Sequence, residues 1–408
     1  MTDLLQGVSE EGKRVGFTLG RALKTCTKQP KKGYFCCRDI LVKSFIAMQI
    51  HPFQALLPCD GNIQDPDAFF KNCKDDYPRL LSEGYFKRRE VPAVFGYEIA
   101  TPSHRFRGIV AALDIRDYLE GRLKIHESTI SEKEAVQETL FVSQQAITKP
   151  VLATYFPSDR ISGWVREITL QPPTLEIAQL AEPVTHRLFA VEDPEEIALL
   201  QRLFQEEMPM AFIADGHHRC AAAAALYQQH PQKPFSRLMC AFFGPDELEI
   251  HGFHRIIDLD GLSGPAFLEA LSSCCTIQPC KAVEMPVQER EMLLFLDPTW
   301  YQLQWKPALW DPWVSDAQLL NERVFRDILG MTNIRKEPRI TYLENPAGIA
   351  ALVEKTKERT GRAAFCISPL SVQRFLEMAA RDMVFPPKST WFEPRMKNGL
   401  FVCPWQYV

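Results

Sequence analysis

Three basic side chains, His217, His218 and Arg219, directly follow Asp215 and Gly216 in the sequence. Groups of this kind bind anions, and arginine suits phosphate because its planar guanidinium can donate to two oxygens at once. Histidine beside aspartate also suits a metal ion, but adjacent histidines on a helix do not face each other as an i, i+4 pair does. The spacing therefore favours an anion site over a metal site.

The flanking residues predict a strand, a turn and a helix around this run. Residues 210–214 form a short apolar stretch, which is typical of a buried strand. Residues 220–227 are rich in alanine, the residue with the highest helix propensity. A helix that begins at His217 would direct its free amide groups and its positive dipole end at Gly216. Cationic groups at a positive helix end are each unfavourable by roughly 0.3–1 kcal/mol, so we expect a phosphate or carboxylate ligand there.

His126 and Glu127 are the next candidates for chemistry. They precede a predicted helix that extends to about residue 145, in which Ser131 with Glu134 fits a capping box. Capping explains the groups at residues 131 and 134 but explains neither His126 nor Glu127. The pair is therefore either a solvated charge pair or part of a site.

A third candidate segment lies near the C-terminus. Lys388, Ser389 and Thr390 follow Pro386 and Pro387, and the prolines block a helix. The segment offers a cation and two hydroxyl groups in a loop. It is either a surface arm or a second anion-binding piece.

The composition is that of an ordinary globular protein. The 408 residues are 46% apolar and 24% charged, which allows two or three domains with a large core. The net charge of −4 argues against nucleic acid as a partner. No apolar run reaches the length of about 18 residues that a membrane span needs, and no signal peptide is evident. The 12 scattered cysteines are typical of free thiols in a reducing compartment, so we expect a cytoplasmic protein.

The order of the apolar patterns predicts a mixed α/β fold. Residues 91–99 and 106–113 are expected to form a hairpin, whereas residues 159–183 have little periodicity and are expected to form a connection or lid. Three regions are predicted: a disordered or non-essential extension over residues 1–47, an N-terminal and central α/β region over residues 48–260 that contains the phosphate-binding motif, and a C-terminal α/β region over residues 261–408.

Several segments of the sequence resemble the signatures of the domain-of-unknown-function 1015 family. They are residues 52–56, 118–134, 213–219 and 387–395, with Gly399 and Leu400 after the last. The resemblance extends over nearly the whole chain from residue 48 onward. Arg395 stands where lysine is expected in that family, a departure that keeps the charge.

The central motif also resembles the Gly-x-x-Arg-x-x-Ala box of the ParB/sulfiredoxin-like fold, here Gly216, Arg219 and Ala222. Members of that group bind nucleotide phosphates at this helix start, and kinases of free serine are among them. The resemblance implies a ParB/sulfiredoxin-like core with additional N- and C-terminal α/β segments. It also implies a phosphate or nucleotide ligand, but it does not by itself fix a reaction, since one fold hosts many functions.

The residues and the resemblance together point to phosphoryl transfer to a small hydroxylated metabolite such as serine. Mg²⁺ with ADP or ATP is the implied cofactor, and a phosphorylated small molecule or nucleotide is the implied partner. Glu127 is the expected general base, with His126 and His218 as further catalytic residues. The residues expected to bind phosphate or nucleotide are Asp215, Gly216, His217, His218, Arg219, Lys388, Ser389 and Thr390. We assign no residues to a dedicated metal site.

Two other functions use the same features. Hydrolysis of a phosphorylated metabolite needs the same phosphate contacts, but it needs no nucleotide, so a nucleotide requirement distinguishes the two reactions. The second alternative is a non-catalytic, nucleotide-gated switch of the ParB kind. Such switches usually carry segments that bind DNA or a partner, and this sequence has no evident helix-turn-helix and no basic patch.

Overall fold

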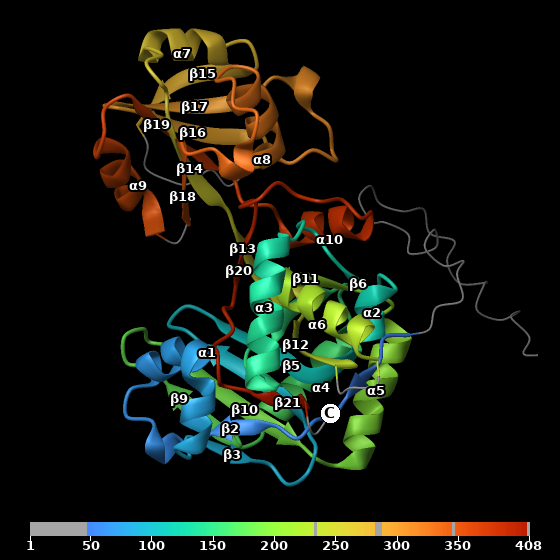
Figure 1. Ribbon diagram of the computed structural model, residues 1–408. Coiled ribbons are helices and arrows are strands. Elements are labelled where there is room, and N and C mark those ends of the chain that lie inside the picture. Colours follow the sequence, from blue (N-terminus) through green and yellow to red (C-terminus); the bar gives the residue numbers. More distant parts are fainter. Residues whose placement is uncertain (1–46, 232–234, 282–287, 345–346, 406–408) are drawn as a thin grey trace, which may run out of the picture. The chain divides into compact units, whose positions relative to one another are not determined.

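The computed structural model describes residues 47–231, 235–281, 288–344 and 347–405 (Figure 1). The predicted extension over residues 1–47 lies outside these described residues, apart from Ala47, and stays a prediction. Within the described part of the chain, no helix is both long enough and apolar enough to cross a membrane.

A nine-stranded sheet forms the first structural unit of the fold. Its strands in spatial order are β6 (Leu123–Lys124), β11 (Ala211–Asp215), β8 (Val151–Tyr155), β12 (Arg237–Phe243), β5 (Arg105–Asp114), β4 (Val94–Ala100), β10 (Thr185–Val191) and β9 (Leu175–Ala178), and β1 (Ile50–His51) pairs with β5. Strands β4 and β5 are antiparallel neighbours, which confirms the predicted hairpin. Strands β8 and β12 are buried along almost their whole length, so side chains on both of their faces contribute to the core.

The helices of this unit pack on the nine-stranded sheet and on one another. They are α1 (Pro66–Ser82), α2 (Ile115–Leu119), α3 (Ser131–Gln144), α4 (Asp159–Thr169), α5 (Pro194–Glu207) and α6 (His217–Gln229). Helix α3 lies against α6, and α6 contacts β8 (Figure 1). This packing places the start of α6 beside the start of α3, a relation that matters for the site.

The prediction of an irregular connection over residues 159–183 is wrong. Helix α4 occupies its first part and strand β9 its second. Ser158 caps the helix by accepting a hydrogen bond from the Ile161 amide. Ile161, Trp164 and Val165 are buried at the i, i+3, i+4 spacing of an amphipathic helix, and α4 packs on β4 and β5. These three apolar positions are visible in the sequence, but they form too short a run to predict a helix by themselves.

A six-stranded sheet forms the second unit. Its strands in spatial order are β15 (Cys275–Cys280), β17 (Thr299–Trp305), β16 (Glu291–Leu296), β19 (Arg362–Ile367), β14 (Phe253–Asp258) and β18 (Ile340–Glu344). Alternate residues of β16 face opposite sides, as the period of a strand requires. Met292 and Leu294 join the core with α7 (Gly264–Leu271), α8 (Asp316–Leu319) and the π-helical segment η5 (Leu320–Arg326). Leu293 and Phe295 join a smaller core with α9 (Gly348–Lys357).

After β19 the chain returns to the first unit. Helix α10 (Val372–Ala380) contacts β11. Three further two-stranded sheets are described: β20 (Trp391–Glu393) with β13 (Glu249–His251), β21 (Cys403–Pro404) with β7 (Ala146–Ile147), and β2 (Leu56–Pro58) with β3 (Phe86–Arg88). The predicted domain boundary at residue 260 stays a prediction. Strand β14 lies before residue 260, and both of its neighbours in the sheet, β18 and β19, lie after it. The sheets and helices together confirm the mixed α/β class.

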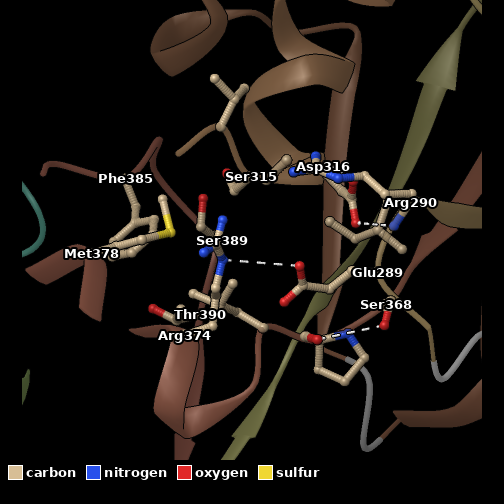
Figure 2. A pocket seen from close by; sticks show the side chains of 15 residues that line it. Glu289, Arg290, Ser315, Asp316, Ser368, Arg374, Met378, Phe385, Ser389 and Thr390 are labelled. Atoms are coloured by element: carbon tan, nitrogen blue, oxygen red, sulfur yellow. Dashed lines mark hydrogen bonds and ion pairs between the residues drawn. The ribbon is translucent and has the colours of Figure 1, made fainter. Parts of the chain in front are cut away.

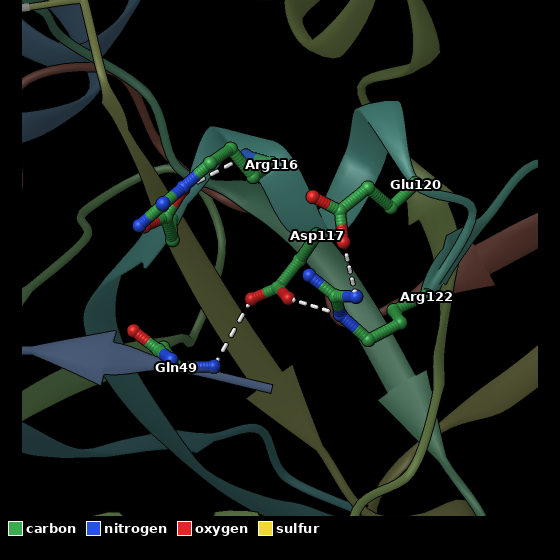
Figure 3. Close-up of polar contacts among 6 residues, drawn as sticks. Gln49, Arg116, Asp117, Glu120 and Arg122 are labelled. Atoms are coloured by element: carbon green, nitrogen blue, oxygen red, sulfur yellow. Dashed lines mark hydrogen bonds and ion pairs between the residues drawn. The ribbon is translucent and has the colours of Figure 1, made fainter. Parts of the chain in front are cut away.

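A buried carboxylate connects the start of the first unit to the segment that carries His126. Asp117 on α2 accepts hydrogen bonds from the Gln49 amide at 3.0 Å and from Arg122 Nε at 2.5 Å (Figure 3). Arg122 also pairs with the exposed Glu120 at 2.5 Å. These contacts fix the turn between α2 and β6, and the chain reaches His126 two residues after β6 ends.

Candidate functional site

The structure confirms the predicted strand, turn and helix at the central motif. Strand β11 ends at Asp215 and α6 begins at His217, with Gly216 as the N-cap at φ 111° and ψ 24°. This backbone conformation favours glycine. A Cβ atom at Gly216 would lie 2.7 Å from Nη2 of Arg219. The guanidinium of Arg219 therefore lies directly against the glycine at the helix N-terminus.

Asp215 is the counter-charge of a cluster of cations. Arg219 Nη2 donates to Asp215 Oδ2 at 2.9 Å, and Lys149 Nζ lies 3.6 Å from the same oxygen. Burial alone would raise the pKa of Asp215, but Arg219, Lys149 and Arg395 outweigh it and hold that pKa well below its usual range. Three cations against one ionised carboxylate leave a surplus of positive charge, which suits an anion.

Lys149 is a site residue that the sequence reasoning missed. It lies between β7 and β8, and burial lowers its pKa to about 8, with a further contribution from the nearby positive charge of Arg219. In the sequence it is a single lysine before Pro150, without a motif of its own. Only the parallel pairing of β8 with β12 and the antiparallel pairing with β11 bring it to Asp215.

His126 lies at the centre of the contacts between the predicted segments. Its Nδ1–H donates to the carbonyl of Ile213 at 2.7 Å, and its own carbonyl accepts from the Phe385 amide at 2.8 Å. Its ring packs against Phe385 and other aromatic rings. Burial, together with nearby His217, holds the pKa of His126 well below its usual value, so the imidazole is neutral near pH 7. Thr390 Oγ1 lies 3.4 Å from His126 Nε2.

The two histidines of the central motif face different neighbours. His217 is buried, and its Nε2 lies 3.4 Å from the His126 amide nitrogen. Burial lowers the pKa of His217 to about 4. His218 Nε2 accepts a hydrogen bond from the Ile130 amide at 3.2 Å, so it satisfies an amide at the N-cap of α3. The predicted capping box at Ser131 is wrong, because Ile130 is the N-cap and makes no side-chain capping bond.

Glu127 is a partly buried carboxylate without a direct partner. It makes no hydrogen bond, and no ion pair within 4 Å, to any residue in the described part of the chain. Burial raises its pKa, and the positive charges of Lys388, Arg335 and Lys133 oppose that rise without overcoming it. A carboxylate of this kind titrates closer to neutral pH than an exposed one.

The C-terminal loop brings Lys388 close enough to interact with Glu127 through charge. Lys388 has φ 57°, and its carbonyl accepts from Arg255 Nη2 at 3.0 Å. Its ammonium group lies over the ring of Phe253, 4.9 Å from the centroid. The backbone of this residue is therefore held by a buried arginine of β14.

Ser389 and Thr390 line a pocket beside this loop. Figure 2 shows its other walls, which include Glu289 and the Arg290–Asp316 ion pair at 3.2 Å. Ser389 Oγ donates to the Pro386 carbonyl at 2.6 Å, so its hydroxyl helps to hold the turn. Of the two hydroxyls, only that of Thr390 makes a described contact with His126. The structure thus brings the three predicted segments together around His126, with Ser389 on the pocket side.

One set of side chains in the described residues could hold a metal ion. One ligand atom from each of His126, Glu127 and His217 lies within 4.8 Å of the other two. This set differs from the combination of Asp215, His217 and His218 that the sequence made conceivable. Asp215 is engaged by Arg219 and Lys149, and the described hydrogen bond of His218 goes to Ile130.

The molecule is thus a mixed α/β protein with a cation-lined helix N-terminus beside a buried histidine and a partly buried carboxylate. The chain belongs to the family described as "protein of unknown function (DUF1015)", whose sequence profile matches residues 56–328, more than half of the chain. No curated protein sequence matches it.

Several solved structures resemble the chain weakly. One is SbnI with a C-terminal truncation from Staphylococcus aureus, with a TM-score of 0.39, 10% identity, and coverage of 71% of this chain and 85% of that chain. A free serine kinase in complex with AMP has a TM-score of 0.37 and 12% identity, with coverage of 72% and 92%. A conserved hypothetical protein from Pyrococcus furiosus has a TM-score of 0.35 and 11% identity, with coverage of 71% and 94%. Likeness at this level carries no argument about the ligand.

Proposed function

We propose that this protein binds a nucleotide at the N-terminus of α6 and transfers a phosphoryl group to a small hydroxylated metabolite such as serine. The observation that carries the proposal is the meeting of three segments around His126. Glu127, which makes no hydrogen bond or ion pair within the described residues, interacts through charge with Asp215 of the cationic cluster. Phosphoryl transfer needs these two features, a base for the hydroxyl and cations for the phosphate oxygens.

Arg219, with the first amides of α6, is the proposed phosphate-binding group. Helix N-terminal amides and a guanidinium both donate to phosphate oxygens. Lys149 lies within reach of the same region and adds a second cation. Asp215 orients Arg219 through its 2.9 Å bond, and Gly216 keeps that guanidinium against the helix start.

Glu127 is the proposed general base. Its raised pKa makes it a better proton acceptor than an exposed carboxylate. The hydroxyl proton passes to Glu127 as the hydroxyl oxygen forms its bond to the terminal phosphorus of ADP or ATP. The bond from that phosphorus to the bridging oxygen breaks, and the nucleotide leaves one phosphate shorter. The positive charge of Lys388, which acts on Glu127, would offset the charge of the transferring group.

The five remaining polar residues have narrower proposed roles. His126 orients the loop that carries Glu127, through its bonds to Ile213 and Phe385. His217 and His218 lie in the first turn of α6, where a neutral imidazole can donate to a phosphate oxygen. Thr390, with its contact to His126, and Ser389 extend the polar lining toward the pocket of Figure 2.

A divalent cation commonly accompanies a nucleotide and neutralises charge on its phosphates. Of the two carboxylates at the site, Glu127 fits such an ion because it has no hydrogen bond or ion pair in the described chain. Asp215 fits poorly, because Arg219 and Lys149 already engage one of its oxygens. Most contacts to Mg²⁺ would come from phosphate oxygens and water.

A thermal-shift panel on the full chain tests the ligand. The compounds are ADP, ATP, CTP, GTP, pyrophosphate and phosphoserine, each with and without Mg²⁺. A ligand at about 100 times its Kd stabilises by roughly 2.7 kcal/mol, which gives a clear shift. Arg219→Ala should abolish the shift, whereas Arg326→Ala, which removes an exposed arginine of η5, should retain it. Absence of any shift from all six compounds in the wild-type protein contradicts the proposal.

A kinase assay tests the chemistry with the nucleotide that the panel identifies. Glu127→Gln should abolish phosphorylation of serine with little loss of nucleotide affinity, because it removes the base but not the phosphate contacts. Glu354→Gln, at an exposed position on α9, is the matched control and should keep full turnover. Unchanged turnover in Glu127→Gln removes the residue from the base role. Release of phosphate from phosphoserine without nucleotide would favour hydrolysis instead.

A further inference from the structure

We propose that His126, Glu127 and His217 form a binding site for a first-row transition-metal dication. The inference goes beyond the proposed phosphoryl transfer and does not depend on it. One ligand atom from each residue lies within 4.8 Å of the other two, which is close enough for one ion to reach all three after small side-chain movements. The three residues come from the loop after β6 and from the first turn of α6.

The hydrogen bonding of His126 leaves one nitrogen suited to a metal. Its Nδ1 lies 2.7 Å from the Ile213 carbonyl, which can only accept, so Nδ1 carries the proton and Nε2 has a free lone pair. A metal-binding histidine usually donates the N–H of its other ring nitrogen to a carbonyl or carboxylate, which fixes the tautomer and the ring orientation. The one described contact to Nε2 is that with Thr390 Oγ1, at a long 3.4 Å.

His217 and Glu127 are also weakly engaged. The described hydrogen bond to the His217 ring comes from the His126 amide at 3.4 Å, beyond the usual range for N–H donors. The His126 and His217 rings meet edge to face, with centroids 4.4 Å apart. Glu127 makes no hydrogen bond or ion pair in the described part of the chain. An ion would thus gain three ligands without breaking a strong contact.

The ligand set indicates the kind of metal. Two imidazole nitrogens and one carboxylate suit zinc, manganese, iron or cobalt, whereas Mg²⁺ prefers oxygen ligands throughout. The negative charge of Asp215 acts on both histidines and favours a cation, whereas the positive charge of Arg219 acts on His217 and opposes one. Lys388, Arg335 and Lys133 act on Glu127 and oppose it. We therefore expect weaker binding than at a structural zinc site, with coordination positions left for water or a ligand oxygen.

The surface holds a second histidine–carboxylate group that serves as a control. His104 Nδ1 lies 3.2 Å from one oxygen of Glu249, and His251 Nε2 lies 3.2 Å from the other oxygen. All three side chains are exposed by about a third or more. Because each histidine already pairs with a different oxygen, this group is less suited to share one ion.

Titration of the chelator-treated, full-length protein with Co²⁺ tests the site, because Co²⁺ absorbs visibly when protein nitrogen and oxygen atoms bind it. We expect one high-affinity Co²⁺ per chain, no thiolate charge-transfer band, and no displacement by an equal concentration of Mg²⁺. Loss of an outer partner of a metal ligand already weakens binding by about 10- to 100-fold, so His217→Ala and Glu127→Gln should each weaken it at least tenfold. His251→Ala should bind like the wild-type protein.

Three results would overturn the inference: no Co²⁺ binding by the wild-type chain, wild-type affinity in both site variants, or loss of binding in His251→Ala. Circular dichroism of each variant shows whether it is folded, and Glu127→Gln removes a ligand from a partly buried position, so it is the less disruptive of the two. The nucleotide shifts described above, measured without metal, report separately on the proposed function. Either idea can therefore fail while the other stands.

Discussion

Replacement of Gly216 by alanine tests whether Arg219 acts as the anion-binding group. The backbone at Gly216 has φ 111°, where a residue with a Cβ is strained by roughly 1–3 kcal/mol. The new Cβ would lie 2.7 Å from Nη2, 2.9 Å from Nε and 3.1 Å from Cζ of Arg219. The flexible guanidinium can swing away, so most of the lost stability should come from the backbone. For a chain of this size we expect the Tm to fall by about 1–4 °C.

The larger effect should be on ligand binding. A charge-assisted hydrogen bond contributes about 1.5–3 kcal/mol, so displacement of Arg219 should weaken the binding of ADP or pyrophosphate by about 10- to 100-fold. Isothermal titration calorimetry well below the Tm measures this loss. Gly361→Ala is the matched control, because Gly361 has φ 76° and nothing within 4 Å of its would-be Cβ. Equal affinities in the two variants would refute the assignment of Arg219, since the strain would then account for the whole effect.

Other perturbations probe the surrounding structure. The pKa of Lys149 is lowered to about 8 in the folded chain, so between about pH 8 and 10 the unfolded chain binds more protons and the stability of the protein rises with pH. Urea unfolding at several pH values should show a smaller rise in Lys149→Met than in the wild-type protein. Asp117→Ala removes the buried carboxylate that the Gln49 backbone amide and Arg122 share, and it should destabilise by about 3–5 kcal/mol. Glu120→Ala breaks only a partly exposed pair and should change the stability by no more than about 1 kcal/mol in the same chemical denaturation. Arg255→Met replaces a buried cation with an apolar side chain, so the Tm should not fall. The variant also loses the hydrogen bond to the Lys388 carbonyl, and calorimetry should therefore show ADP binding weakened about threefold or more.

Local patterns in the sequence predicted the centre of the site well. The apolar run before Asp215 and the alanine-rich run after His217 correspond to β11 and α6, because propensity and burial favour the same structure there. The basic residues in the first helical turn led us to expect an anion there, and that expectation stays a prediction. The ion pair between Asp215 and Arg219 was not predicted, because Asp215 was expected to bind phosphate or nucleotide.

Contacts between distant segments could not be predicted in the same way. Lys149 reaches Asp215 only through the pairing of β8 with β11, and no local pattern encodes a register between strands. The start of α3 did not follow the predicted capping box of Ser131 with Glu134. Ile130 is the N-cap, and its amide donates to the imidazole of His218. Residue 218 lies on another helix, so only the packing of α3 on α6 reveals this contact.

The two carboxylates of the site show how its charges are divided. Burial raises the pKa of both Asp215 and Glu127, yet only at Asp215 do cations within ion-pair distance reverse the effect. Asp215 is therefore ionised throughout the working pH range, with its charge engaged by Arg219 and Lys149. The positive charges of Lys388 and its other basic neighbours act on Glu127 without forming an ion pair, so the pKa of Glu127 stays raised. Enzymes assign different tasks to paired carboxylates by separating their pKa values in this way. The same reasoning makes Glu127, and not Asp215, the group that can accept a proton or bind a metal ion.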